Sequence, residues 1–239
     1  LAEDTKILFV AGKKSHGYFS HEHNAGSLLL AKALDESGLN FDASVYHDPE
    51  DPGWPRNRNL LEGIKAVVIY CDGGKRHIAN NHVAAIDALQ DRGVGVGCLH
   101  YAVETVDGEA GDAFLRWMGG YYQLYKSVNP HWTPKFEKLP DHPVANGVEP
   151  FSINDEWYFN MRFRQDGVGK ITPILAAKPG KDVRDGPYVY PKGPYQHILD
   201  AQGRPETTMW TYERPNGSRG FGFTGGHKHV NWGNDNYRK

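Results

Sequence analysis

Short apolar runs alternate with segments of helical periodicity over the first hundred residues. We expect strands at 6–12, 41–47, 65–71 and 94–99, and helices at 23–38, 60–64 and 82–93. Runs such as KILFVAG and KAVVIYC are unbroken, which is typical of parallel strands that are covered on both faces. The pattern therefore predicts an α/β fold, with a doubly wound, mostly parallel sheet that is flanked by helices.

The pattern becomes irregular after about residue 110. We expect a helix at 111–118, strands at 151–163 and 170–178, a long ordered loop over 179–206, and a hairpin that turns at PNGS, residues 215–218. Because we find no repeat and no linker, we expect one domain over residues 1–239, with a loop-rich second half.

Charge and hydropathy exclude several classes of partner. The formal net charge is −2 and basic residues do not cluster, so we do not expect a nucleic-acid partner. No apolar stretch approaches the roughly 20 residues that span a bilayer, so we expect no membrane partner. The oligomeric state stays open.

The two cysteines and the start of the chain bear on its compartment. Cys71 and Cys98 each follow an apolar run, so we expect two buried thiols and no disulfide framework. The chain begins LAEDTK, with neither Met nor an apolar leader, which is typical of a mature exported protein. We expect a periplasmic or secreted location, with a cytoplasmic one as the alternative.

Aromatic residues make up 12% of the chain, and it has twelve histidines. Most of the histidines lie in Gly-, Asn- or Trp-rich turns. This composition suits a polar small-molecule site, with sugars among the candidate ligands and with or without a metal. A loop-rich surface with many exposed aromatic rings explains the composition equally well.

Histidines follow three of the expected strands, in the segments AGKKSHGYFSHEH, CDGGKRH and CLHYAVE. Ligands of doubly wound folds bind beyond the carboxyl ends of the strands. In the first segment, His16 and His21 are candidate metal ligands, because neutral imidazole is a common ligand of zinc. The alternative is helix capping by Ser20 beside surface histidines.

His100 stands where a strand is expected to pass into a helix. If a helix begins there, Glu104 shares its face and orients the imidazole. The alternative is an ordinary packed helix start. Near the carboxyl terminus, GGHKHVNW supplies His227 and His229, whose spacing in a strand would put both rings on one face. The alternative is an exposed histidine pair.

The segment NDEWYF begins an expected strand with Asp155 and Glu156. A carboxylate beside Trp157 and Tyr158 serves as a general acid or base, binds a metal, or pairs with a nearby arginine, and the sequence does not choose among these roles. His131 and Trp132 are candidates for stacking against a sugar ring. No GxGxxG opens a helix, so we expect no nucleotide cofactor.

A set of motifs, taken in order, resembles the ThuA-like (trehalose-utilisation) family from about residue 5 to the end. The motifs are SHGYFSHEHNAG, IYCDGG, GCLHYAVE, WMGGYYQLYKSVNPHW, HPVANGVEPFSINDEWYF and GFGFTGGHKHVNW. The resemblance implies the class I glutamine amidotransferase-like, flavodoxin-like fold and a place in carbohydrate metabolism, because family members occur with sugar dehydrogenases and with proteins that process 3-keto sugars. The patterns around His16 and His227 resemble a subgroup found in exported proteins of polysaccharide-degrading bacteria.

The resemblance also bears on the mechanism. In the amidotransferases a cysteine nucleophile occupies the corner after the strand equivalent to 94–99, and here His100 stands there. The amidotransferase His and Glu map onto His227 and His229, so the glutamate is absent too. We therefore do not expect glutamine hydrolysis through a thiol.

Our first hypothesis is an enzyme that acts on a sugar or 3-keto-sugar by metal-assisted hydrolysis, elimination or isomerisation. The expected ligands of a divalent metal such as zinc are His16, His21, His100 and His227. His100 and His229 are also candidate catalytic groups, with Glu104 or Glu156 as the general acid or base. We expect a sugar-facing wall of Trp132, Trp157, Tyr158 and Trp232, with His131 beside it.

Two alternatives remain. The first is a non-catalytic sugar-binding module that keeps an amidotransferase-like shell. The second is a thiol enzyme that uses Cys98 or Cys71. The sequence does not identify the substrate, the reaction type or the metal.

Overall fold

The computed structural model describes residues 4–50 and 53–239. Leu1, Ala2 and Glu3, at the start of the segment on which the export expectation rests, lie outside the described residues. Within the described part, no helix is long and apolar enough to span a membrane.

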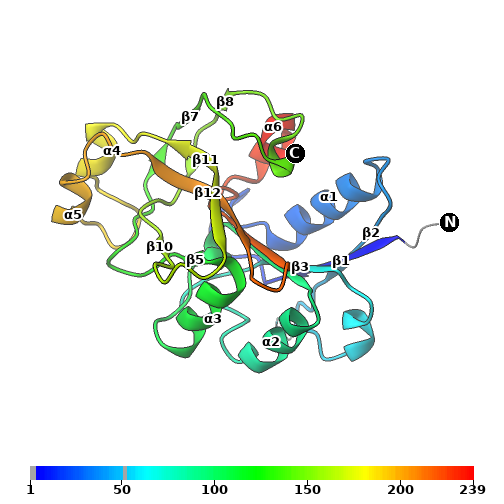
Figure 1. Ribbon diagram of the computed structural model, residues 1–239. Helices are drawn as coiled ribbons and strands as arrows, with labels where there is room; N and C mark the ends of the chain where they lie inside the picture. The colour runs from blue at the N-terminus through cyan, green and yellow to red at the C-terminus, as the bar shows by residue number, and fades with distance from the viewer. Residues whose placement is uncertain (1–3, 51–52) are drawn as a thin grey trace.

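A seven-stranded sheet runs through the centre of the described chain, in the order β2-β1-β3-β4-β13-β12-β11 (Figure 1). Neighbours from β2 to β13 pair in parallel, and the pairs of β12 with β13 and with β11 are antiparallel. The strands are β1 (Thr5–Ala11), β2 (Phe41–Tyr46), β3 (Ala66–Tyr70), β4 (Gly95–Leu99), β11 (Lys170–Ala177), β12 (Glu206–Glu213) and β13 (Arg219–Phe223). The doubly wound, mostly parallel fold expected from the apolar pattern is confirmed.

Helices cover both faces of this sheet. They are α1 (His23–Asp35), α2 (Val83–Asp91), α3 (Glu109–Met118) and the short α4 (Lys181–Asp185), α5 (Gln196–Leu199) and α6 (Asp235–Arg238). Side chains alternate along a strand, so Leu8 and Val10 of β1 enter one core while Phe9 enters the other. In Figure 1, α2 and α3 lie on one side of the sheet and α1 lies on the other.

The turn at PNGS forms as expected: β12 and β13 pair as a hairpin, and Gly217 takes a φ of +80°. The segment 151–163, in contrast, is not one strand. It is divided into β8 (Phe151–Ser152), β9 (Asp155–Glu156) and β10 (Arg162–Phe163), which pair with β7 (Lys135–Phe136), β6 (His131–Trp132) and β5 (Gly120–Tyr121). The prediction assumed a strand with one buried and one exposed face. It failed because residues 155–159 are all buried.

Two expected helices are single 3₁₀ turns, Arg58–Leu61 and His100–Val103. The second ends before Glu104, whose backbone is extended. With three residues per turn and an extended residue at its end, this segment does not put His100 and Glu104 on one face, so that expectation is wrong. The expected loop 179–206 contains α4 and α5, and the buried Arg184 donates to Glu206 at its end.

Gly97 allows close packing between β4 and β13. A Cβ atom on Gly97 would lie 2.0 Å from the Phe221 ring, so the neighbouring strand leaves no room for a methyl group. We expect Gly97→Ala to lower the free energy of unfolding by about 1–3 kcal/mol, because the ring or the strand must shift. The measurement is urea denaturation, with Gly233→Ala as the control, since a Cβ at Gly233 meets nothing within 4 Å. Equal stability of the two variants would contradict this expectation.

Candidate metal centre

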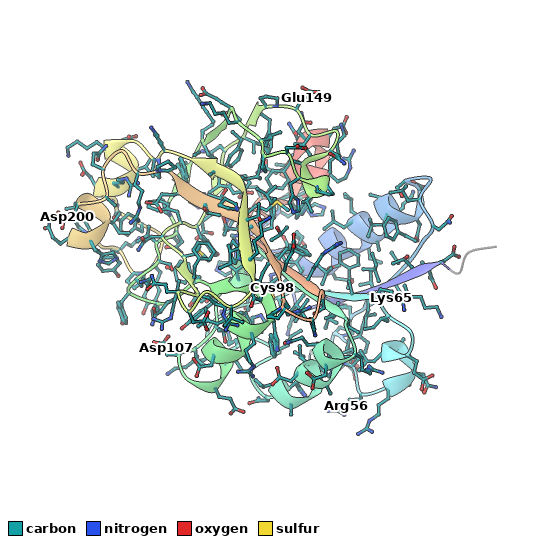
Figure 2. All side chains as sticks on the ribbon, viewed as in Figure 1. Arg56, Lys65, Cys98, Asp107, Glu149 and Asp200 are labelled. Atoms are coloured by element: carbon teal, nitrogen blue, oxygen red, sulfur yellow. The ribbon has the colours of Figure 1, made fainter. Side chains whose placement is uncertain are left out.

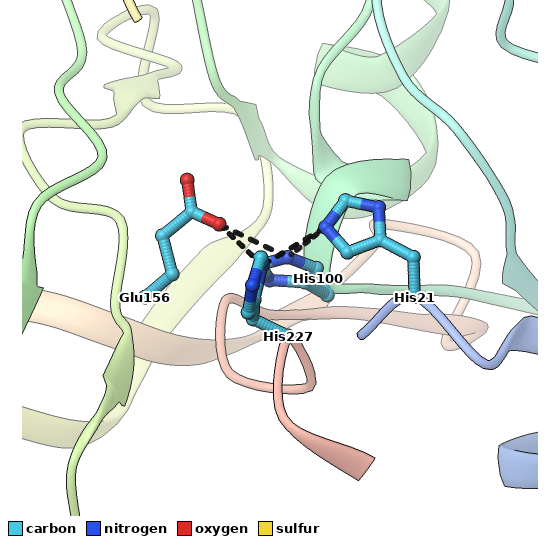
Figure 3. A group of neighbouring side chains, drawn as sticks. All are labelled: His21, His100, Glu156 and His227. Atoms are coloured by element: carbon cyan, nitrogen blue, oxygen red, sulfur yellow. Dashed lines mark hydrogen bonds and ion pairs between the residues drawn. The ribbon is translucent and has the colours of Figure 1, made fainter. Parts of the chain in front are cut away.

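Four loops meet at the carboxyl ends of β1, β3, β4 and β13, as expected for a doubly wound sheet. They supply His21 after β1, Asp72 after β3, His100 after β4 and His227 after β13. Glu156 joins them from β9. Figure 3 shows His100 and His227 between Glu156 on one side and His21 on the other.

His100 is the first residue after β4, and its side chain is completely buried. Its Nδ1 donates to the carbonyl of Thr224 at 2.9 Å. That hydrogen bond fixes the tautomer, so the lone pair of Nε2 points into the centre. The backbone at His100 has a φ of +52°, a strained conformation for a side-chain-bearing residue.

His21 is oriented by the loops after β1 and β3. Ser15 Oγ donates to Asp72 Oδ1 at 2.5 Å, and His21 Nδ1 donates to Ser15 Oγ at 3.2 Å. Asp72 Oδ1 also lies 3.6 Å from His21 Nδ1. The Nε2 lone pair of His21 therefore points into the centre, and a carboxylate behind a histidine raises its basicity as a ligand.

His227 Nδ1 lies 2.6 Å from Glu156 Oε2, which is also 3.6 Å from His100 Nε2. Asn129 Nδ2 donates to the other carboxylate oxygen, Oε1, at 2.9 Å. Glu156 is thus held from one side by an amide and faces two imidazoles with the other oxygen.

The four inward atoms fit a cation. His21 Nε2 lies 3.1 Å from His100 Nε2 and 3.0 Å from His227 Nδ1, and one ligand atom from each of the four side chains lies within 4.8 Å of the others. Four atoms around zinc at bond lengths of 2.0–2.1 Å would stand about 3.3 Å apart. The lone pairs of His21 and His100 face each other with no proton between them, and a positive ion is a partner that both lone pairs could share.

Burial keeps the imidazoles of His21 and His100 neutral. Desolvation lowers the pKa of His21 to about 4, and it lowers the pKa of His100 well below its usual value, with the neighbouring imidazoles acting in the same direction. Burial also raises the pKa of Glu156, and His227 opposes that rise. Neutral imidazole is the form that binds metals.

Asp155 organises the loop that carries His227. This buried carboxylate accepts hydrogen bonds from the backbone N–H groups of Gly226 at 3.0 Å and Lys228 at 3.1 Å. It also accepts from the amide of Asn231 at 3.0 Å and from the hydroxyl of Tyr237. Asp155 therefore holds the loop of His227 in place, whereas Glu156 contributes its carboxylate to the centre.

Two of the expected histidines lie outside this group. His16 is exposed, and it belongs to a second cluster with His21 and Asp72. Arg76 already pairs with Asp72 there, at 3.2 Å. His229 begins a 3₁₀ helix, His229–Gly233, and its ring contacts Phe19. Because residues 227–229 are not a strand, the two imidazoles of this pair do not share a face.

The expected wall of tryptophans is wrong. Trp132, Trp157 and Trp232 are between 0% and 5% exposed and pack in one core with Phe223 and Tyr237. Large apolar rings stabilise most when they are fully buried. These three lie in the core that joins one face of the sheet to the loop-rich segments.

Tyr158 and His131 do border the centre. Tyr158 is also buried, but its hydroxyl donates to His100 Nε2 at 3.2 Å. His131 is exposed, and its ring centre lies 5.0 Å from that of His227.

Sequence reasoning missed three residues that orient the centre: Ser15, Asp72 and Asn129. Asp72 stands directly after Cys71 at the carboxyl end of β3, so its position was a usable signal. Asn129 gave no such signal, because its contact with Glu156 depends on how the irregular second half folds.

Among the described residues, the Glu104 carboxylate has no hydrogen-bond or ion-pair partner. It lies close to the backbone of Gly74, where an added Cβ would be 3.2 Å from Oε1. Burial, and then the charge of Glu156, raise the pKa of Glu104 to about 8. The Glu104 side chain is therefore protonated at neutral pH, as a general acid must be.

This raised pKa predicts a pH-dependent stability. Between pH 4.5 and about 8 the unfolded chain releases the Glu104 proton while the folded protein keeps it, so the folded protein loses stability as the pH rises. A glutamine does not titrate. We therefore subtract the unfolding free energy of the unchanged protein from that of Glu104→Gln. This difference should grow as the pH rises across this range and should level off above it. Urea denaturation in chelator at several pH values measures this, and a constant difference would contradict it.

Both cysteines are buried and unpaired, as expected. Figure 2 labels Cys98 near the middle of the molecule. Burial raises the pKa of Cys71 to about 12 and that of Cys98 well above its usual value. A thiol that stays protonated is a poor nucleophile, which argues against the thiol enzyme.

The sequence model of the ThuA family, described as trehalose utilisation, matches residues 6–239. The chain belongs to the ThuA family. This is a carbohydrate-related family, as the resemblance implied. Among curated proteins, none matches the chain.

Two solved ThuA-like proteins have a similar fold. The one from Bacteroides uniformis is 15% identical, at a TM-score of 0.61 over 99% of this chain and 88% of that chain. The one from Parabacteroides merdae is 17% identical, at a TM-score of 0.59 over 94% of this chain and 80% of that chain. A glutamine amidotransferase from Thermotoga maritima is 11% identical, at a TM-score of 0.45 over 94% of this chain and 76% of that chain.

Proposed function

We propose that this ThuA-family chain is a metal-dependent enzyme that acts on a sugar or 3-keto-sugar, with a divalent cation held by His21, His100, His227 and Glu156. The observation that carries the proposal is the meeting of three imidazole nitrogens and one carboxylate oxygen, with neighbouring pairs 2.6 to 3.6 Å apart. The family description, trehalose utilisation, supports a carbohydrate as the substrate.

The chemistry needs an electrophile and a proton carrier. A divalent cation at this position supplies Lewis acidity, which polarises a carbonyl or glycosidic oxygen. Glu104, protonated and without a partner, would give a proton to a leaving oxygen. The Tyr158 hydroxyl, beside His100, would hold a substrate oxygen close to the centre.

Access to the centre is from the His227 side. His227 is 14% exposed, whereas Glu156 and His100 are 3% and 0% exposed. The exposed rings of His16 and His131 flank His227, with ring centres 6.2 and 5.0 Å from it. In this proposal His131 therefore contacts the substrate. His16 is not a metal ligand, as the sequence analysis expected, but lies at the opening of the site.

The first experiment is metal analysis of the purified protein before and after dialysis against a chelator. It is followed by turnover assays with 3-keto-glycosides and their unoxidised parents. We expect one stoichiometric divalent ion and turnover that is lost with it and restored by zinc, manganese or cobalt. A metal-free protein that binds sugars without converting them would support the binding-module alternative. Hydrolysis, elimination and isomerisation are distinguished by their products.

A further inference from the structure

Two exposed aromatic rings, which we call the aromatic pair, lie on the loop between β1 and α1. Tyr18 is 87% exposed and Phe19 is 44% exposed, and their ring centres are 4.4 Å apart. The backbone N–H of His229 donates to the Phe19 carbonyl at 2.9 Å, and the two rings of these residues are 6.0 Å apart. The next residue on that loop, Val230, is 67% exposed. Single exposed rings are ordinary, whereas two rings in contact form a patch that is typical of a binding surface.

The turn that carries the aromatic pair is held in one shape. The backbone N–H of Ser20 donates to the Gly17 carbonyl at 3.2 Å, which closes a turn with Tyr18 and Phe19 at its middle. Lys14 Nζ also donates to the Gly17 carbonyl, at 3.0 Å. Phe19 has a φ of +58°, at a turn position that favours glycine or asparagine. A phenylalanine there is strained, so the turn itself does not call for an aromatic ring.

Both ends of this turn lead into the metal centre. His16 precedes it and His21 follows it, and their ring centres are 3.8 Å apart. Tyr18 is two residues from His16, so their Cα atoms are at most about 7 Å apart. The same limit holds for Phe19 and His21. The backbone N–H of His21 also donates to the carbonyl of His227 at 3.1 Å. The aromatic pair therefore lies beside the opening of the centre.

The place and the chemistry of the pair fit a sugar ring. An aromatic face packs on the C–H face of a pyranose, and a phenol hydroxyl bonds to its hydroxyl groups. Because the pair and the ligand His21 belong to one short loop, a single glycoside can reach both.

We propose that Tyr18 and Phe19 form a sugar-binding subsite for the second ring of a glycoside whose first ring lies at the metal centre. The inference rests on the proposed function and deepens it, because it selects two-ring glycosides over monosaccharides. It also gives the carbohydrate-facing role to exposed rings of the first loop instead of to Trp132, Trp157 and Trp232, which are buried.

The test compares the binding of two-ring and one-ring sugars by the full chain after incubation with zinc. Calorimetric titration uses trehalose, maltose and cellobiose, each also in its 3-keto form, with methyl α-glucoside as the one-ring probe. We expect at least one disaccharide to bind about tenfold more tightly than methyl α-glucoside, because ring packing adds to the contacts at the centre. Tyr18→Ala and Phe19→Ala should remove that advantage, and Tyr18→Trp, which retains an aromatic face, should keep it.

Tyr125→Ala is the matched control. Tyr125 is 62% exposed and has a φ of +65°, so it is another exposed ring at a left-handed position. It contacts no aromatic ring among the described residues, and its loss should leave the disaccharide advantage unchanged. The subsite is overturned if no disaccharide is preferred, if no probe binds, or if Tyr18→Ala keeps the preference.

Zinc titration distinguishes a lost subsite from a damaged centre. Tyr18→Ala should bind zinc as tightly as the unchanged protein, and a weaker zinc affinity would show that the turn only supports the centre. A Tyr18→Ala variant that changes the oligomeric state but not the sugar affinity would assign the pair to a contact between protein chains. Either result overturns the subsite.

The same experiments separate the two proposals. If 3-keto-sugars are converted by a metal-loaded protein that shows no Tyr18-dependent preference, the subsite falls and the function stands. If the preference depends on Tyr18 and no sugar is converted, the function falls and a binding subsite remains.

Discussion

His227→Ala is expected to lower the affinity of the purified protein for Zn²⁺ by at least about 100-fold, because one of the four converging atoms proposed as ligands is lost and Glu156 loses the imidazole 2.6 Å from it. The measurement is a competition titration against a chromophoric chelator. Cobalt absorption spectra should weaken in parallel, which reports on the ligands independently of any reaction.

His229→Ala is the matched control, since the two histidines are separated by one residue. His229 belongs to the 3₁₀ helix that follows and lies outside the ligand group, so its loss should leave the Zn²⁺ affinity unchanged. If both variants bind zinc equally well, or if both lose it equally, the ligand assignment is wrong.

Asp155→Ala is expected to lower the free energy of unfolding by about 3–5 kcal/mol, because it leaves several buried donors without an acceptor. Those donors are the backbone N–H groups of Gly226 and Lys228, the Tyr237 hydroxyl, and one of the two N–H groups of the Asn231 amide, whose other N–H keeps its bond to the Asn154 carbonyl. The loop that carries His227 then loses its anchor, so Zn²⁺ affinity should fall in the same variant.

Urea denaturation and zinc titration of the same samples check this expectation. Asp155→Asn keeps the shape and one acceptor oxygen, so its loss of stability should be intermediate. Asp166→Ala is the control, because Asp166 is about half exposed and pairs only with its neighbour Arg164 and the turn at Val168. An unfolding free energy of Asp155→Ala close to that of the control would show that the loop holds its shape without this carboxylate.

The sequence predicted the elements whose apolar pattern matches their surroundings. The buried strands and the turn at Asn216–Gly217 are local signals, and the parallel order follows from them. The segment 151–163 was wrongly predicted as one strand. It is divided among three short strands with different partners, and that pairing depends on contacts with residues far away in the chain.

The site was predicted in part for the same reason. His21, His100 and His227 follow strands whose carboxyl ends meet, so their convergence could be expected. The choice between Glu104 and Glu156 could not, because it depends on a 3₁₀ turn after β4 and on the pairing of β9 with β6. The tryptophans were misplaced because an aromatic residue in a loop-rich segment carries no local mark of whether it is buried.

His21 and His227 are 206 positions apart in the chain, and their ring nitrogens lie 3.0 Å from each other. An ion held between them would close a loop of almost the whole polypeptide. Closing so long a loop costs chain entropy, and the long-range strand pairings must form first to meet that cost. Ion capture would therefore be among the last events of folding. It would act as a reversible cross-link whose strength follows the free ion concentration of the compartment.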